Sequence, residues 1–235
     1  MLSAVMFIAC LAAGHAPQAA TPDPAVAEVR QTVDAARKEI DAYTAAGGKA
    51  GTDQHPAVRW EARLWAYRDR YPSTRAAASA TAEAVRLLVR AGLWDRAHAR
   101  LESVGLDDPA WERLPAVVYD EGIARKDLPS TIATLSRVAQ STRTPSIKAA
   151  ALIVVGRAHR RAGDGEAATR ALQAAKAAAP GSRYAEEADG IIYEIAYLSI
   201  GMVPPAIVAT ARDGRAVDLA GFRGKAVVLV FWGTT

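Results

Sequence analysis

Prolines recur at nearly constant spacing through the middle of the chain. Pro72, Pro109, Pro145 and Pro180 are separated by 37, 36 and 35 residues. Between them apolar residues recur every three or four positions, which is the period of an amphipathic helix. Because proline cannot continue a helix, we expect each of these prolines to close a helical segment. The spacing therefore predicts a mainly α fold of antiparallel helical repeats.

The helical pattern extends from Val26 to about Ile200. Only 6% of the residues are aromatic, and alanine is the commonest residue, a composition typical of closely packed helices. An all-β sandwich is therefore not expected for most of the chain. The glycine-rich loop 46–51 is expected to end the first helix. It does not fit a phosphate-binding loop, because Lys49 is followed by Ala50 where that motif requires Ser or Thr.

The last repeat carries the most complete motif. Its motif residues are Leu152, Val155, Gly156, His159, Gly163, Ala168, Leu172 and Pro180. This order resembles the tetratricopeptide helix–turn–helix pattern, with His159 at the usual aromatic position. The resemblance implies stacked helix pairs whose concave surface binds a peptide or a partner protein. The alternative is an irregular helical bundle that serves as a spacer or a dimer surface.

The earlier repeats match this pattern less well. In the unit ending at Pro145, Arg137 occupies a position where a large apolar residue is expected. The motif residues kept in the other two units are Ala84, Val85, Leu88, Gly92, Ala97 and Leu101 before Pro109, and Trp60 and Leu64 before Pro72. Small residues are expected where paired helices approach closely, as at Ala167, Ala168 and Ala171.

The pattern changes after Gly201. Asp213 and Gly214 predict a tight turn between two short strands, and the apolar run 226–232 is typical of a buried strand in an α/β sheet. This segment resembles the opening of the thioredoxin-like domain in exported thiol-disulfide oxidoreductases of the TlpA/ResA type and in the related redoxins and peroxiredoxins. The matching positions are Pro205, Asp213, Gly214, Leu219, Gly224, Lys225, Phe231, Trp232 and Thr234.

The resemblance implies that a Cys-x-x-Cys pair follows directly after Thr235. In that family the first cysteine attacks a substrate disulfide as a thiolate, and the second resolves the mixed disulfide. The chain as written would then be an inactive fragment, because Cys10 is its only cysteine. We accordingly predict no catalytic, cofactor-binding or metal-binding residues and no cofactor. Without its neighbouring strands, the segment 203–235 is expected to pack poorly.

The N-terminal 20 residues have the features of a signal peptide. Leu2 to Ala13 is an apolar run too short to span a bilayer, and small residues follow it, although no Lys or Arg precedes it. We therefore expect export to the periplasm or cell envelope of a bacterium. Cys10 weakly resembles a lipoprotein cysteine, which implies a membrane anchor through the N-terminus; the alternative is a small residue within a discarded signal.

These observations predict three regions: a signal peptide over 1–20, a helical tetratricopeptide-like domain over 21–200, and the incomplete N-terminal β portion of a thioredoxin-like α/β domain over 201–235. The predicted function is that of an exported thiol-disulfide oxidoreductase whose helical domain mediates protein interaction. Its expected partners are envelope proteins with thiols or disulfides, and a peptide or protein bound by the helical domain. The alternatives are a periplasmic helical-repeat scaffold without redox activity, and a peroxiredoxin-type antioxidant.

Other functions find little support. The net charge is +4, but 29 basic and 25 acidic residues are interleaved, so nucleic-acid binding is not expected. No hydrolase motif occurs. The histidines His98 and His159, the latter beside Arg157, Arg160 and Arg161, are expected at the surface or in packing. Core or helix-pair packing is likewise expected for Trp60, Trp65, Tyr67, Tyr71, Trp94 and Trp111.

Overall fold

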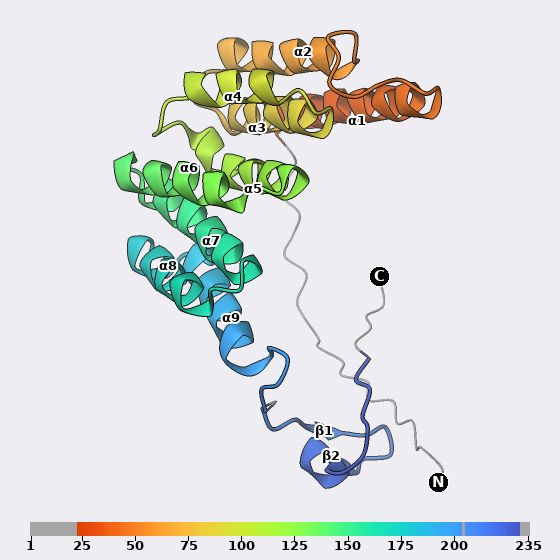
Figure 1. Cartoon of the computed structure of the whole chain (residues 1–235), viewed down its shortest axis with the longest axis vertical. Helices are drawn as coiled ribbons and strands as arrows, with labels where there is room; N and C mark the ends of the chain where they lie inside the picture. Colours follow the sequence, from red (N-terminus) through yellow and green to blue (C-terminus); the bar gives the residue numbers. More distant parts are fainter. Residues whose placement is uncertain (1–22, 204, 231–235) are drawn as a thin grey trace. The chain divides into compact units, whose positions relative to one another are not determined.

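The computed structural model describes residues 23–203 and 205–230, and over these residues the chain is mainly helical (Figure 1). The predicted signal peptide, with Cys10, lies outside the described residues. The chain divides into two compact units, a helical unit that reaches Ile195 and a C-terminal unit that begins at Ala196. The helices are α1 (Pro24–Ala45), α2 (Ala57–Arg70), α3 (Arg75–Arg90), α4 (Trp94–Ser103), the 3-10 helix η1 (Pro109–Glu112), α5 (Leu114–Arg125), α6 (Leu128–Ser141), α7 (Pro145–Arg161), α8 (Gly165–Ala178) and α9 (Arg183–Tyr197).

Short turns join the helices into successive pairs. Gly92 between α3 and α4 and Gly163 between α7 and α8 adopt positive φ angles of 71° and 85°. Glycine suits these turns because it lacks a Cβ atom that would clash in the left-handed conformation. Lys126 fills the same role between α5 and α6, with a φ of 57°. The predicted helix–turn–helix of the last repeat is therefore formed by α7 and α8.

The recurring prolines do not all close helices. Pro72 and Pro180 follow the ends of α2 and α8, as predicted. The prediction is wrong for Pro109 and Pro145, which begin η1 and α7. Proline is favoured in the first turn because its missing N–H group is one that the helix leaves unpaired there, and its fixed φ angle is already helical.

The buried face of α6 also differs from the expected one. The proline spacing placed Arg137 inward, but Arg137 is exposed, and the buried side chains are those of Thr131, Leu135, Val138 and Ala139. Thr131 and Leu135 are four residues apart, as are Ala168 and Leu172 on α8. The buried pair of α6 therefore lies two residues earlier than the proline predicts.

Two helices are buried on nearly all sides and form the centres of the core. α3 contacts α1, α2, α4, α5 and η1, while α7 contacts α5, α6, α8 and η1. The core divides into a larger cluster that spans α1 to α7 and a smaller one that joins α7, α8 and α9. At Leu172 in the smaller cluster, a Cβ atom added to Gly156 would lie 2.7 Å from the Cγ atom of the leucine. Close packing of α7 on α8 thus requires glycine at this position.

The C-terminal unit contains an antiparallel hairpin of β1 (Val208–Thr210) and β2 (Ala216–Asp218), followed by the 3-10 helix η2 (Leu219–Phe222). Ala209 pairs with Val217, and Gly214 in the turn has a φ of 82°. The predicted turn at Asp213 and Gly214 is therefore confirmed.

The predicted strand over 226–232 does not form in residues 226–230. No ladder joins these residues to another strand in the described part of the chain, and Val228 and Val230 are 81% and 59% exposed. A fully apolar strand is stable only between hydrogen-bonded neighbours and under covering helices. The poor packing expected for this segment is observed here, and residues 231–235 lie outside the described residues.

We predict that Gly156→Ala destabilises the helical unit by about 1–3 kcal/mol, because the new methyl group would press against Leu172. The matched control is Gly190→Ala on α9, where nothing lies within 4 Å of an added Cβ atom. Gly190→Ala should stabilise the protein by about 0.5–1 kcal/mol, since alanine loses less backbone freedom on folding. Chemical denaturation of both variants measures the two effects. Equal stability of the two would contradict the close contact at Gly156.

Candidate functional site

The aromatic side chains lie mainly in the core, as predicted. Trp111 and Tyr67 are 3% and 6% exposed within the larger core cluster. Partly buried against that cluster are Trp60, Trp65, Tyr71 and Trp94. These rings stabilise helix packing and do not converge on a common site.

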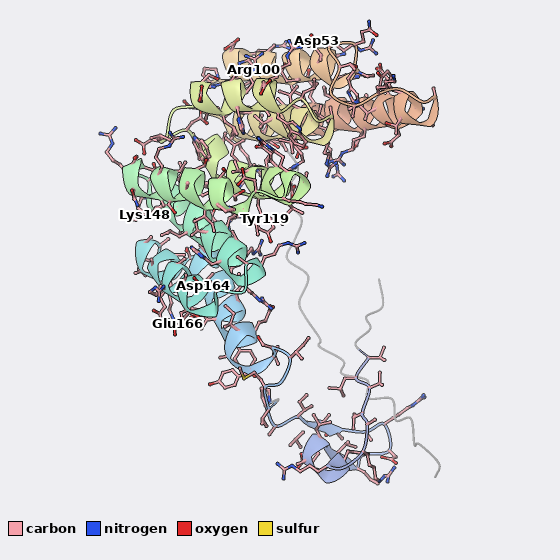
Figure 2. All side chains as sticks on the ribbon, viewed as in Figure 1. Asp53, Arg100, Tyr119, Lys148, Asp164 and Glu166 are labelled. Atoms are coloured by element: carbon pink, nitrogen blue, oxygen red, sulfur yellow. The ribbon has the colours of Figure 1, made fainter. Side chains whose placement is uncertain are left out.

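Arginine guanidinium groups lie over three of these rings, those of Trp60, Trp65 and Tyr71. Figure 2 labels Arg100 on α4. Its guanidinium lies 4.4 Å from the centre of the Trp65 ring and donates to Oε1 of Glu61 at 2.6 Å. Glu61 is almost fully buried, so this ion pair satisfies a charge that would otherwise be costly to bury. The contact ties α4 to α2 and has a structural role.

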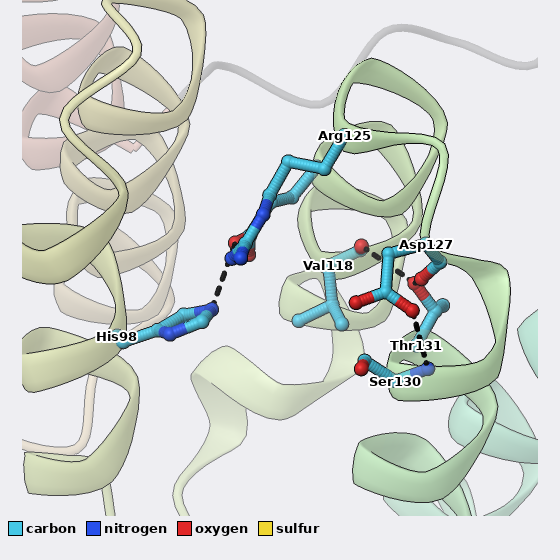
Figure 3. A network of polar contacts seen from close by, with 7 residues as sticks. His98, Val118, Arg125, Asp127, Ser130 and Thr131 are labelled. Atoms are coloured by element: carbon cyan, nitrogen blue, oxygen red, sulfur yellow. Dashed lines mark hydrogen bonds and ion pairs between the residues drawn. The ribbon is translucent and has the colours of Figure 1, made fainter. Parts of the chain in front are cut away.

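His98 takes part in a small polar pocket of about 120 Å³ between α4, α5 and α6. Its Nε2 lies 2.7 Å from Oε1 of Glu121, and Nη1 of Arg125 donates to the same oxygen at 2.9 Å. Figure 3 shows His98 and Arg125 facing each other across the pocket, with Asp127 capping the start of α6 through the backbone N–H of Ser130. The contact of His98 with Glu121 joins α4 to α5.

The second histidine and its arginine neighbours also lie where surface or packing residues were predicted. His159 is partly exposed, with Nδ1 4.0 Å from Oδ2 of Asp164 at the start of α8. Arg157 and Arg160 form ion pairs with Glu187 and Glu194 of α9 at 2.7 and 2.6 Å. These arginines hold α9 against α7.

A larger cavity of about 540 Å³ opens beside the end of α2 and the start of α3, and we call it the junction cavity. It lies between the end of α2, the first two turns of α3 and the connection that leads into η1. The lining residues are Arg68, Asp69, Pro72, Ser73, Thr74, Ala77, Ala78, Thr81, Asp107, Asp108 and Pro109. No residue singled out for function in the sequence lines this cavity.

One carboxylate of the junction cavity organises the neighbouring connection between α6 and α7. Oδ1 of Asp107 accepts hydrogen bonds from the Thr142 hydroxyl at 2.8 Å and from the Arg143 backbone N–H at 2.7 Å. The Thr144 hydroxyl and the Arg143 guanidinium donate at 3.3 Å each. These donors, chiefly the Arg143 N–H, lower the pKa of Asp107 to about 2. Asp107 therefore stays ionised and joins two loops about 35 residues apart.

Three other features of the cavity are an ion pair, a serine in a left-handed conformation and a buried threonine. Nη2 of Arg68 lies 3.1 Å from Oδ2 of Asp108. Ser73 has a φ of 61°, a left-handed conformation that costs a non-glycine residue free energy. Thr81 is 1% exposed, and its hydroxyl makes no hydrogen bond within the described ranges. Two features of the sequence could have indicated this cavity. They are the threonine within the alanine-rich stretch of α3 and the Asp107-Asp108-Pro109 turn.

No group of three or more His, Cys, Asp or Glu side chains suited to a metal ion occurs in residues 23–203 and 205–230. None of the helices in those ranges combines the length and apolar composition needed to cross a membrane. Comparison of the chain with family models, with curated proteins and with solved structures gave no match.

We predict that Asp107→Asn lowers the thermal unfolding midpoint at pH 7, because the amide cannot accept all the hydrogen bonds of the carboxylate. The folded-state pKa of about 2 lies below the ordinary value of 3.8. The stabilisation by Asp107 is therefore complete above about pH 3.8 and is lost as the pH falls toward 2. Thermal melts from pH 7 to pH 2 should show a smaller acid dependence in the variant. Asp69→Asn is the control, and an identical loss in both variants would contradict the prediction.

Proposed function

We propose that the helical unit is the protein-binding module of an exported, thioredoxin-like thiol-disulfide oxidoreductase, and that the junction cavity holds a segment of the bound partner. The observation that supports this most directly is the cavity itself, with its volume of about 540 Å³. Binding pockets for small ligands and side chains are commonly about 300–1,000 Å³. The cavity is therefore large enough for one or two residues of a peptide.

The chemistry of the lining also favours binding over catalysis. The lining combines the apolar side chains of Pro72, Ala77 and Ala78 with hydroxyl and carboxylate groups. An extended peptide has backbone N–H and C=O groups as well as side chains, so it can use both kinds of contact. No cysteine occurs between residue 11 and residue 235, so these residues contain no thiol nucleophile.

The redox part of the proposal rests on the C-terminal segment. Its resemblance to a thioredoxin-like opening includes the hairpin turn at Asp213 and Gly214, and a hairpin is found there. In such a protein the helical unit would present envelope proteins with thiols or disulfides to a Cys-x-x-Cys pair encoded after Thr235. A helical scaffold without redox activity remains the second candidate, favoured by the self-contained packing of residues up to Ile195.

For the binding module, we predict that peptides selected from a random phage library against the whole chain protect the junction cavity. Hydrogen exchange with and without a selected peptide should slow at the amides of residues 68–81 and 105–109. The matched variant is Ala78→Trp, which should fill the cavity and weaken binding at least tenfold. Ala66→Trp on the exposed face of α2 is the control. Protection confined to other parts of the chain would contradict this function.

For the redox part, the decisive measurement is the source DNA downstream of the Thr235 codon. We expect cysteine codons at the first and fourth positions, and the encoded protein should reduce insulin disulfides. Replacement of either cysteine by serine should abolish that reduction. A single peroxide-reactive cysteine would instead support the peroxiredoxin alternative. An in-frame stop codon would contradict the redox part and favour the scaffold.

A further inference from the structure

The junction cavity has one carboxylate without a counter-charge. Asp107 is paired with Arg143, and Asp108 is paired with Arg68. Asp69, at the exposed end of α2, has no ion pair and no side-chain hydrogen bond among the residues that the structure describes. The cavity lining therefore favours a ligand with a positive charge.

A buried hydroxyl adds a second polar group to the same cavity. Thr81 is 1% exposed and lines the cavity, and its hydroxyl has no hydrogen-bond partner within the described part of the chain. In that part, no side-chain nitrogen or oxygen is both sealed from solvent and unpaired. The hydroxyl of Thr81 therefore keeps a small accessible surface, and Thr81 is one of the residues that line the cavity. Such a hydroxyl gains free energy when a ligand supplies the missing hydrogen bond.

Apolar groups complete the lining. The side chains of Pro72, Ala77, Ala78 and Pro109 all contribute to the wall. Lysine and arginine bury their methylene stems along such surfaces and keep their charged ends near polar groups. A bare metal ion fits the cavity less well, because Asp107 and Asp108 already form ion pairs with arginines. Of the lining carboxylates, only Asp69 has no ion pair among the described residues.

We propose that the junction cavity receives a lysine or arginine side chain from an extended segment of a partner protein, with Asp69 as its ion-pair partner and the Thr81 hydroxyl as an acceptor. This inference rests on the proposed function, since it names the chemistry of the segment that the helical unit binds. Lysine and arginine have only hydrogen-bond donors, so they complement a free carboxylate and a free hydroxyl oxygen.

The test compares three pools of fluorescein-labelled heptapeptides with blocked ends. The central residue is lysine, glutamine or glutamate, and the other positions are random uncharged residues. Fluorescence anisotropy with the whole 235-residue chain should show the lysine pool binding about tenfold more tightly than the glutamine pool, the value of one charge-assisted hydrogen bond. The glutamate pool should bind most weakly. Asp69→Asn should remove the advantage of lysine, whereas Asp41→Asn, on an exposed part of α1, should keep it.

Thr81→Val provides an independent readout, because valine keeps the shape of threonine and removes the hydroxyl. We expect this variant to weaken binding of the lysine pool several-fold and to leave the thermal unfolding midpoint unchanged or raised. A lowered midpoint with unchanged binding would show that Thr81 has only a structural role, and would overturn its part in the proposal.

The remaining outcomes distinguish a failure of the proposed basic side chain from a failure of the proposed binding function. Equal binding of the three pools, unchanged by Asp69→Asn, would overturn the basic side chain but leave the binding module intact. Lysine preference with exchange protection away from residues 68–81 and 107–109 would overturn the assignment to this cavity. Failure of every pool to bind the helical unit would contradict the proposed function itself.

Discussion

Close packing of helices through small side chains is the constraint on which the rest of this structure depends. α3 and α7 are each surrounded by other helices, and alanines that are fully buried lie along both of them. Ala80 and Ala84 on α3, and Ala151 and Ala158 on α7, leave room for the neighbouring backbones. Gly156 allows Leu172 to approach still more closely. Larger residues at these points would separate the pairs and open the core.

Polar contacts at the periphery set how successive helix pairs are joined. The exposed ion pairs of Arg157 and Arg160 with α9 contribute little free energy, since water screens them. Asp107 differs because it binds a backbone N–H group, which fixes the path of the connection between α6 and α7. The buried carboxylates Glu61 and Glu121 are each paired with an arginine on the surface. The apolar core thus provides stability, and these contacts provide orientation.

The sequence predicted the helical class, the glycine turns and the hairpin because each depends on local chemistry. Gly163 and Gly214 have the positive φ angles that only glycine adopts easily, so their positions could be recognised without tertiary contacts. The inward face of α6 could not be recognised in this way, because the spacing of prolines indicates where helices begin and end but not how they are rotated about their axes. The junction cavity escaped prediction since Thr81 and Asp107 are brought together only by folding.

The junction cavity lies beside two of the recurring prolines, Pro72 and Pro109. Pro72 follows the end of α2 and Pro109 starts η1, so one helix ends and another begins beside the cavity. Helix ends leave backbone groups unpaired, and short polar residues such as Thr74 and Asp108 cap them. These caps cannot fill the space as apolar side chains would. The capped helix ends therefore make part of the lining polar, and the cavity brings the carboxylate of Asp69 and the buried Thr81 together.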